Sequence, residues 1–386
     1  MVTYPSDWTE SKLLDHVNLV QGLTYTPENV KSHGTLVLRS SNIQEGHLAL
    51  EDNVYVDSII PEDKMIQEGD ILVCVRNGSS ALIGKSCVLP VMSNTTFGAF
   101  MSVLRGDRTG YIAKVFESDI VQEQVRGRSN ATINQITKKD FKSITVTMPD
   151  ENEQKAIAGV LSCFDSYISD LVELIEKKKA IRDGALEDLV SGRIRLDGHT
   201  CSWKQVELGS IASYRKERDV QPRRLYISTE NMNQMFSGII PYEGNEPTGG
   251  TAFFPGDTLI ANIRPYLKKI WYAEFAGTCS ADVLVLAGND RIVPKFLYYS
   301  LANDRFISYV MTGGVKGIKM PRGDKKYIMK YPLLIPSDIH EQKIISEMIS
   351  AMDNEIMALE DERNKMIQIR EGAMDDLLTG RVRLTV

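Results

Sequence analysis

The feature that most constrains the fold of this chain is an internal repeat. Residues 153–196 align without a gap on residues 341–384, an offset of 188, with 19 identities over 44 positions. Both copies begin with Glu-Gln-Lys and end with Gly-Arg-x-Arg-Leu. A repeat of this length predicts one structural unit that occurs twice, with each copy packed against a neighbour.

Each copy is predicted to form one long helix, because no proline interrupts it. Asp150 and Glu153 have the Asp-x-x-Glu spacing of a capping box, in which a cap side chain and a returning carboxylate satisfy amides at the helix start. Asp338 and Glu341 repeat this spacing in the second copy. The sequence therefore predicts where both helices begin.

Apolar residues form a narrow stripe along each predicted helix. Their spacing alternates between four and three residues, the pattern of a coiled-coil seam. A lone helix with one apolar stripe needs a partner, so we expect the copies to pair as an antiparallel coiled coil with pseudo-twofold symmetry. The alternative is that each helix packs only on its own globular domain. The stripe consists of Ile157, Leu161, Phe164, Ile168, Leu171 and Ile175 in the first copy, and of Ile345, Ile349, Met352, Ile356 and Leu359 in the second.

The segments outside the helices have short β-branched runs, glycines and all 14 prolines of the chain. This texture predicts the α/β (α+β) class, with two globular domains that alternate with the two long helices. The expected globular domains are residues 1–149 and 198–336, and the expected helical spacers are residues 150–197 and 337–386. The weak repeat between the globular domains consists of Gly69-Asp70 with Arg76 and of Gly256-Asp257 with Arg264, aligned with a one-residue gap.

The composition is that of a multidomain globular protein. A chain of 386 residues is long enough for two or three domains, and 42% apolar and 25% charged residues are ordinary values. The longest unbroken apolar stretch, Ile71–Val75, is too short to span a bilayer, and the first residues show no leader pattern. We therefore expect a cytoplasmic protein that does not enter a membrane.

The sequence contains no recognisable catalytic, cofactor or metal site. The five cysteines form no Cys-x-x-Cys pair, and we interpret them as buried free thiols. The nearest approach to a phosphate-binding loop, residues 78–86, has Ser79 where a glycine is required. No histidine ligand spacing, nucleophile motif, methyltransferase motif or nuclease carboxylate cluster is recognisable. We expect no catalytic residue, no cofactor and no metal ion.

Basic residues are concentrated in two windows, although the net charge is −6. Residues 124–148 and 312–336 hold five and six Lys or Arg against one Asp each, and both precede a long helix. Lys and Arg can neutralise phosphates, while Asn, Gln and Arg can read base edges. The windows therefore predict two equivalent DNA-contacting surfaces. The candidate DNA-binding residues are Arg76, Lys85, Arg126, Arg128, Asn130, Asn134, Gln135, Lys138, Lys139, Arg264, Lys268, Lys269, Lys316, Lys319, Arg322 and Lys325.

The order of these features is similar to that of a known family. Glu-Gln-Lys opens each helix shortly after a proline, Gly-Asp-x-Leu precedes an Arg in each globular half, and Gly-Arg-x-Arg-Leu closes each helix. In this duplicated order the whole chain resembles the specificity subunits of type I restriction-modification enzymes. The resemblance implies that each globular domain reads one half of a bipartite site in double-stranded DNA.

The same resemblance implies what the chain assembles with. The helices would set the spacer between the half-sites and dock modification subunits, which carry S-adenosylmethionine and adenine methylation. We expect two modification subunits, one on each outer face of the helix pair, and restriction subunits that join through the assembled complex. Catalysis would then lie in the partners, which agrees with the missing catalytic motifs.

Two other functions are compatible with parts of the sequence. A non-catalytic coiled-coil scaffold for protein–protein interaction would use the helices, with the basic windows serving only solubility. Salt-dependent binding to duplex DNA would favour the DNA reader over this scaffold. A methyltransferase or nuclease with a degraded motif is the other alternative, which methylation or cleavage by the chain alone would support.

Overall fold

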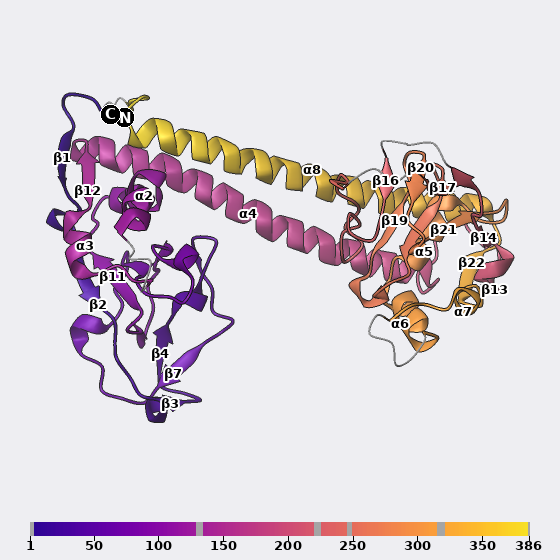
Figure 1. Ribbon diagram of the computed structural model, residues 1–386, viewed down its shortest axis with the longest axis horizontal. Helices are drawn as coiled ribbons and strands as arrows, with labels where there is room; N and C mark the ends of the chain where they lie inside the picture. Colours follow the sequence, from indigo (N-terminus) through magenta and orange to yellow (C-terminus); the bar gives the residue numbers. More distant parts are fainter. Residues whose placement is uncertain (1–3, 129–133, 220–224, 245–248, 315–320, 385–386) are drawn as a thin grey trace. The chain divides into compact units, whose positions relative to one another are not determined.

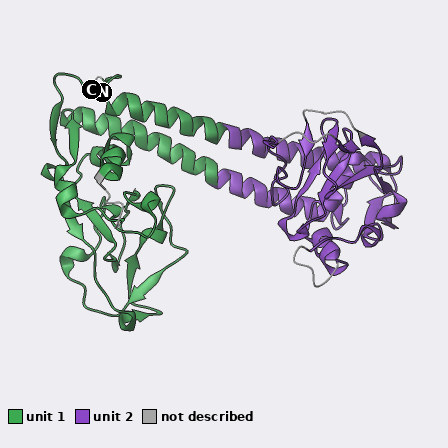
Figure 2. Cartoon of the chain, viewed as in Figure 1, with its two compact units in different colours: residues 1–172, 362–386 green, residues 173–361 purple. Residues whose placement is uncertain are grey.

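The computed structural model forms two compact units (Figures 1 and 2). Unit 1 comprises residues 1–172 and 362–386, and unit 2 comprises residues 173–361. Each unit therefore contains one globular segment, the beginning of one long helix and the end of the other. The residues that the structure describes are 4–128, 134–219, 225–244, 249–314 and 321–384.

The two long helices are α4 (Glu151–Val190) and α8 (Ile339–Leu378), each of 40 residues. The boundary between the units falls within both of them (Figure 2). Both helices begin where the sequence predicts, since the Asp150 carboxylate accepts the amide of Glu153 at 3.1 Å and the Asp338 carboxylate accepts the amide of His340 at 2.9 Å. The prediction of two uninterrupted helices is confirmed.

Within the described residues, the globular part of unit 1 contains two four-stranded sheets, two two-stranded sheets and three short α-helices. The sheet of order β2-β11-β8-β9 is antiparallel throughout, and in the sheet of order β10-β4-β7-β3 only β10 and β4 run parallel. Strands β1 and β12 pair beside the start of α4. The bounds are β1 Thr9–Lys12, β2 Asn18–Gln21, β3 Val30–Lys31, β4 Thr35–Leu38, β5 Ile43–Gln44, β6 His47–Leu48, β7 Val54–Val56, β8 Ile71–Cys74, β9 Ser86–Val88, β10 Thr95–Phe97, β11 Met101–Arg105, α1 Tyr111–Glu117, α2 Asp119–Arg128, α3 Lys138–Ser143 and β12 Thr145–Met148.

Unit 2 repeats this order of elements. Its antiparallel sheet β14-β21-β18-β19 corresponds to β2-β11-β8-β9, and a second sheet, β15-β17-β20-β16, again contains one parallel pair. Strands β13 and β22 pair beside the start of α8 as β1 and β12 pair beside α4. The bounds are β13 Trp203–Glu207, β14 Ala212–Tyr214, β15 Arg218–Asp219, β16 Tyr226–Ile227, β17 Gly250–Phe253, β18 Thr258–Ala261, β19 Ile270–Tyr272, β20 Gly277–Cys279, β21 Val283–Gly288, α5 Pro294–Leu301, α6 Asp304–Thr312, α7 Lys325–Ile328 and β22 Pro332–Pro336.

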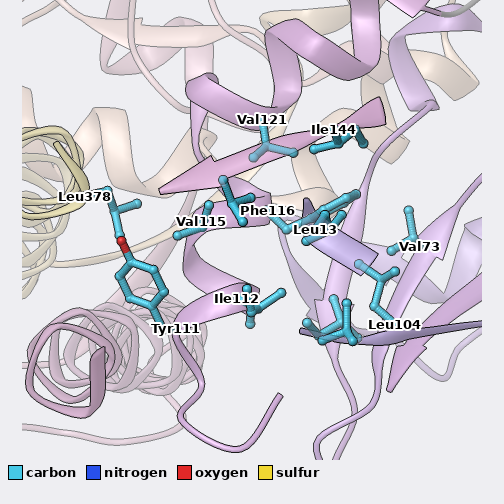
Figure 3. Close-up of a cluster of buried hydrophobic side chains, with 14 of the residues drawn as sticks. Leu13, Val73, Leu104, Tyr111, Ile112, Val115, Phe116, Val121, Ile144 and Leu378 are labelled. Atoms are coloured by element: carbon cyan, nitrogen blue, oxygen red, sulfur yellow. The ribbon is translucent and has the colours of Figure 1, made fainter. Parts of the chain in front are cut away.

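The hydrophobic core of each unit includes residues of both long helices. In unit 1, Ile157 and Leu161 of α4 belong to the same buried cluster as Leu377 and Leu378 of α8. Figure 3 shows part of this cluster, including Leu378 of α8 and Tyr111 of α1. In unit 2 the corresponding cluster contains two leucines of α4 and Ile345 of α8. The helices therefore contact the globular segment and each other within each unit. None of the predicted stripe residues is exposed.

In unit 1, a buried carboxylate ties the start of α4 to the segment that follows α8. The side chain of Arg383 donates to both oxygens of Glu153, from Nε at 2.6 Å and from Nη2 at 2.8 Å. The indole of Trp8 donates to the same carboxylate at 3.2 Å, and the guanidinium lies 5.7 Å from the centre of the Trp8 ring. The hydrogen bonds that Arg383 donates to Glu153 and Asp7 raise the pKa of its guanidinium.

Unit 2 forms the same cluster with the roles of the two repeats exchanged. Arg195, which follows α4, donates to Glu341 of α8 from Nε at 2.9 Å and from Nη2 at 3.2 Å. The Trp203 indole donates to Glu341 at 3.1 Å, and the carboxylate side chain is fully buried. We call each set the Glu–Arg–Trp cluster. The return half of the predicted capping box is therefore wrong, because both glutamates bind an arginine and a tryptophan instead of their own helix amides.

The glycine of Gly-Arg-x-Arg-Leu turns the chain from the helix end into this cluster. Gly192 and Gly380 have φ angles of +69° and +71°, a conformation that ends helices and favours glycine. A Cβ on Gly192 would also lie 3.1 Å from the Trp203 ring, and one on Gly380 would lie 2.5 Å from Pro5. A side chain at either position would strain the backbone. It would also collide with Pro5 at position 380 and press on the Trp203 ring at position 192.

The cysteine prediction is correct in one respect and wrong in another. All five cysteines are free, but Cys163 and Cys201 are exposed. Burial raises the pKa of the Cys87 and Cys279 thiols to about 12.

We predict that Arg195→Met destabilises unit 2 by about 3 kcal/mol, because it leaves the buried Glu341 carboxylate without its cation. The matched control is Arg193→Met, which should cost less than about 1 kcal/mol. Among the described residues, Arg193 pairs with the exposed Glu187 and the half-buried Asp188. Urea unfolding followed by tryptophan fluorescence measures both. Equal losses in the two variants would contradict a special role for the buried carboxylate.

Candidate nucleic-acid interface

The candidate site in each unit is a junction between two segments. One segment follows a central strand, and the other lies three and four positions before a short helix. In unit 1, Arg76 forms an isolated β-bridge with Gln135. The backbone N–H of Asn77 donates to the backbone carbonyl of Asn134 at 3.2 Å. The sheet and the basic window predicted from the sequence therefore meet here. We call this set of residues the unit 1 junction.

Unit 2 has an equivalent junction. Ile263 forms an isolated bridge with Arg322, and the Arg264 amide donates to the Pro321 carbonyl at 2.9 Å. All four residues of these two contacts have numbers 187 higher than their counterparts in unit 1, so the two junctions align without a gap. Arg264 thus occupies the position of Asn77, and not that of Arg76 as the sequence alignment with its gap suggests.

A pocket of about 430 Å³ opens at the unit 1 junction. It is lined by Arg76, Asn77, Gly78, Phe100 and Asn134. The Arg76 guanidinium lies 5.1 Å from the centre of the Phe100 ring, and that ring is 56% exposed. The guanidinium and amides can hydrogen-bond base edges or phosphates, and an exposed ring can stack on a base. Phe100 and Asn77 are additions that the sequence alone did not indicate.

The pocket wall is held by hydrogen bonds of its asparagine side chains. The side-chain amide of Asn134 donates to the Gly78 carbonyl at 2.8 Å. The side-chain amide of Asn77 donates to the Ser40 hydroxyl at 3.1 Å. These bonds fix the two side-chain amides in one orientation. Their remaining donors and acceptors are therefore held in fixed directions. A rigid frame of this kind suits base recognition.

Helix α3 carries the next two candidates. Lys138 and Lys139 are exposed in its first turn, and neither forms an ion pair within the described part of the chain. The turn is fixed by Thr137 and Asp140, whose side chains and amides form a capping box. The two ammonium groups are therefore displayed next to the junction and are free to meet phosphates.

In unit 2 the junction is also basic, but its side chains are more engaged. Arg322 pairs with Asp282 at 3.1 Å, and Lys325 begins α7. Asp324 caps this helix, and the amides of Tyr327 and Lys326 lower the pKa of its carboxyl group. Arg264 is exposed, with φ at +51°.

The structure places the remaining candidates elsewhere. Lys85 is half-buried before β9, Arg126 on α2 pairs with Asp119, and Lys268 pairs with Asp304 beside a different cavity. Lys269 donates to the Thr229 carbonyl at 2.6 Å, and burial, reinforced by Arg264, lowers the pKa of its ammonium group. Candidates Asn130, Lys316 and Lys319 lie outside the described residues, as does the side chain of Arg128.

The described residues were also compared with the requirements of a metal site and of a membrane span. No group of three or more His, Cys, Asp or Glu side chains there could hold a metal ion. No helix among those residues is both long enough and apolar enough to cross a membrane.

Comparison with known proteins places these features in context. The family model described as "Type I restriction modification DNA specificity domain" matches residues 5–181 and again residues 202–368. The two matches follow the duplicated order of elements described above. Together they cover most of the chain.

Named relatives match at modest identity. The type I restriction enzyme EcoKI specificity subunit of Escherichia coli K12 is 28% identical over 216 residues, which is 53% of this chain and 46% of the relative. This match spans about half of that protein's length. The type I restriction enzyme MjaVIII specificity subunit of Methanocaldococcus jannaschii is 24% identical over 98% of this chain and 94% of its own.

One solved structure supports the fold. The crystal structure of a type I restriction-modification system S subunit from M. genitalium aligns with a TM-score of 0.63 and 18% identity. The alignment covers 96% of each chain.

We predict that the double variant Lys138→Gln/Lys139→Gln weakens duplex binding equally for all sequences and reduces the salt slope of log K by about 1 to 2. The matched control, Lys155→Gln/Lys177→Gln, removes the same charge from exposed lysines of α4 that pair with acids of their own helix. Fluorescence anisotropy across a salt series measures both. An equal fall in slope for the two variants would show a general charge effect and not a contact surface.

Proposed function

Because this chain belongs to the type I restriction-modification DNA specificity family, we propose that it is the subunit that recognises the DNA target and that each unit reads one half of a bipartite site. This proposal rests on one observation. The same junction occurs in both units, but the side chains at equivalent junction positions differ. An equivalent position with different donors and acceptors is what a reader of two different half-sites needs.

The unit 1 junction supplies the chemistry of recognition. Arg76, Asn77 and Asn134 can contact base edges, Phe100 can stack, and the lysines of α3 can hold the phosphate backbone. In unit 2, Arg264, Arg322 and Lys325 take the corresponding positions. The remaining predicted contacts, including Lys268 and Lys269, stay part of the proposal.

The long helices are proposed to pair as an antiparallel coiled coil with pseudo-twofold symmetry. Contacts within the units support this. Arg383 binds Glu153 while Arg195 binds Glu341, so each contact recurs with the two repeats exchanged. Reciprocal contacts of this kind are the mark of a twofold interface. The pair would then set the distance between the two half-sites.

The proposed partners follow from the same symmetry. Two modification subunits would dock on equivalent outer faces of the helix pair, and restriction subunits would join through the assembled complex in the cytoplasm. Catalysis belongs to those partners, and this chain contributes recognition. A coiled-coil scaffold without DNA recognition would not account for the matched basic junctions.

The test uses insertions in both helices at the unit boundary, between Val172 and Glu173 and between Asp361 and Glu362. Four residues in each helix add about 6 Å and a rotation of about 40° beyond a full turn, which leaves the contacts inside each unit intact. Methylome sequencing of a host that expresses the chain with its modification subunit should show a gapped motif. The insertion variant should keep both half-sites with a spacer longer by one or two base pairs, at ~3.4 Å per base pair.

The control is a two-residue insertion at the same places. It rotates the helical stripes by about 200° and should abolish assembly and methylation. A four-residue variant with full activity and an unchanged spacer would contradict the proposal that the helices set the distance.

A further inference from the structure

A cavity of about 450 Å³ lies within unit 2, and among its lining residues only Lys268 belongs to the DNA contacts proposed above. Its walls come from the last turns of α4, from α5 and α6, and from β22. Its volume falls within the range of about 300–1,000 Å³ that is usual for small-molecule sites. The lining residues that bear on the ligand are Arg182, Ser300, Ala302, Arg305, Tyr331 and Leu333.

The same place in unit 1 contains a carboxylate that belongs to the chain. Arg370 of α8 binds Asp165 through Nε and Glu117 through Nη2, the latter at 2.8 Å. Burial opposes ionisation of Asp165, but the Lys114 and Arg370 contacts outweigh it and lower the pKa of this carboxyl group. In unit 1 the arginine is therefore paired with two carboxylates.

Unit 2 lacks the second of these carboxylates. Arg182, at the repeat position of Arg370, donates to Asp353 from Nη1 at 3.0 Å. Glu117 lies two residues before helix α2, and the residue two positions before helix α6 is Ala302. The position that Glu117 holds in unit 1 is thus occupied by a methyl group that lines the cavity, and Arg182 has Asp183 as its second ion-pair partner.

Unit 2 also adds polar groups where unit 1 has apolar ones. Counted from the start of α2 and α6, Ser300 replaces Val115 and Arg305 replaces Ile120. The side chain of Ser300 is 2% exposed, and its hydroxyl has no hydrogen-bond partner. A buried hydroxyl without a partner is costly, and such groups in native proteins call for an explanation.

The two arginines of the cavity differ in their pairing, because Arg182 forms ion pairs with Asp353 and Asp183. Arg182 Nε lies 2.9 Å from an oxygen of Asp183 but forms no hydrogen bond. Arg305 is exposed at the cavity and has no ion pair within the described residues. The other charged lining residues are neutralised, since Lys268 pairs with Asp304 and Glu187 pairs with an arginine outside the cavity.

We propose that this cavity binds a small carboxylic acid with a short apolar stem, whose carboxylate takes the place that Glu117 fills in unit 1. The carboxylate would pair with Arg182 and Arg305 and accept from the Ser300 hydroxyl. The apolar stem would lie against Tyr331 and Leu333. The three differences between the units fit this one ligand class, because a carboxylate is removed while a hydroxyl donor and a guanidinium are added.

The test is titration of the full chain with 4-phenylbutyrate and with its neutral amide, measured by isothermal titration calorimetry. The acid should bind at least about tenfold more tightly than the amide, because hydrogen bonds to an ionised acceptor are the stronger ones. The Ala302→Glu variant supplies the carboxylate from within the chain. It should lose at least about tenfold in affinity for the acid and gain thermal stability.

A second variant keeps the test valid if Ala302→Glu fails to fold. Arg305→Gln changes an exposed residue and should weaken binding of the acid by about fivefold or more with unchanged circular dichroism. Its control is Lys343→Gln, an exposed cation of α8 that does not line the cavity and should leave binding unchanged.

Several results would overturn the assignment. They are the absence of binding by the acid, equal binding of acid and amide, unchanged affinity in Arg305→Gln, or displacement of the acid by inorganic phosphate with equal affinity. Since calorimetry reads this ligand directly and no DNA is present, each of these results leaves the proposed DNA recognition untouched.

Discussion

The structure depends on one interaction that occurs twice, the bidentate ion pair between a buried glutamate at the start of one repeat and an arginine just after the end of the other. A buried carboxylate is tolerated only when it is paired and hydrogen-bonded, and here an arginine and a tryptophan indole meet both requirements. The partner of each glutamate comes from the other repeat. Each unit can therefore complete its core only when both long helices are present.

This constraint explains why the repeats stay similar while the globular segments diverge. The helices must keep Glu-Gln-Lys and Gly-Arg-x-Arg-Leu because each motif forms half of a contact in both units. The globular segments must keep only a sheet order and a strand that pairs beside each helix start. Their loops are free to change, and the differences between Asn77 and Arg264, or between Glu117 and Ala302, are examples.

The sequence predicted features that depend on local pattern. Helix starts at Asp150 and Asp338 follow from capping chemistry, and the buried stripe follows from spacing along one helix. It did not predict the role of Glu153, because the arginine that binds it is 230 residues away and the local pattern pointed to a capping box. Long-range partners of this kind are fixed only by the tertiary structure.

The candidate interface also combines residues that local pattern predicted with residues that only the tertiary structure brings together. Asn134 and Gln135 were predicted from a charged window, while Phe100 and Asn77 emerged only when the fold brought separate segments together. The replacement of Glu117 by Ala302 was equally hidden, because it requires a comparison of two globular segments that align weakly in sequence.

If the two units are separable readers on one frame, replacement of residues 208–331 by the same segment of a related chain should change one half-site only. This exchange leaves β13, β22 and both Glu–Arg–Trp clusters unchanged. Methylome sequencing of a host that carries the exchanged chain should show one half of the gapped motif replaced and the other half retained. A motif in which both halves change together, or in which neither changes while methylation persists, would contradict the account.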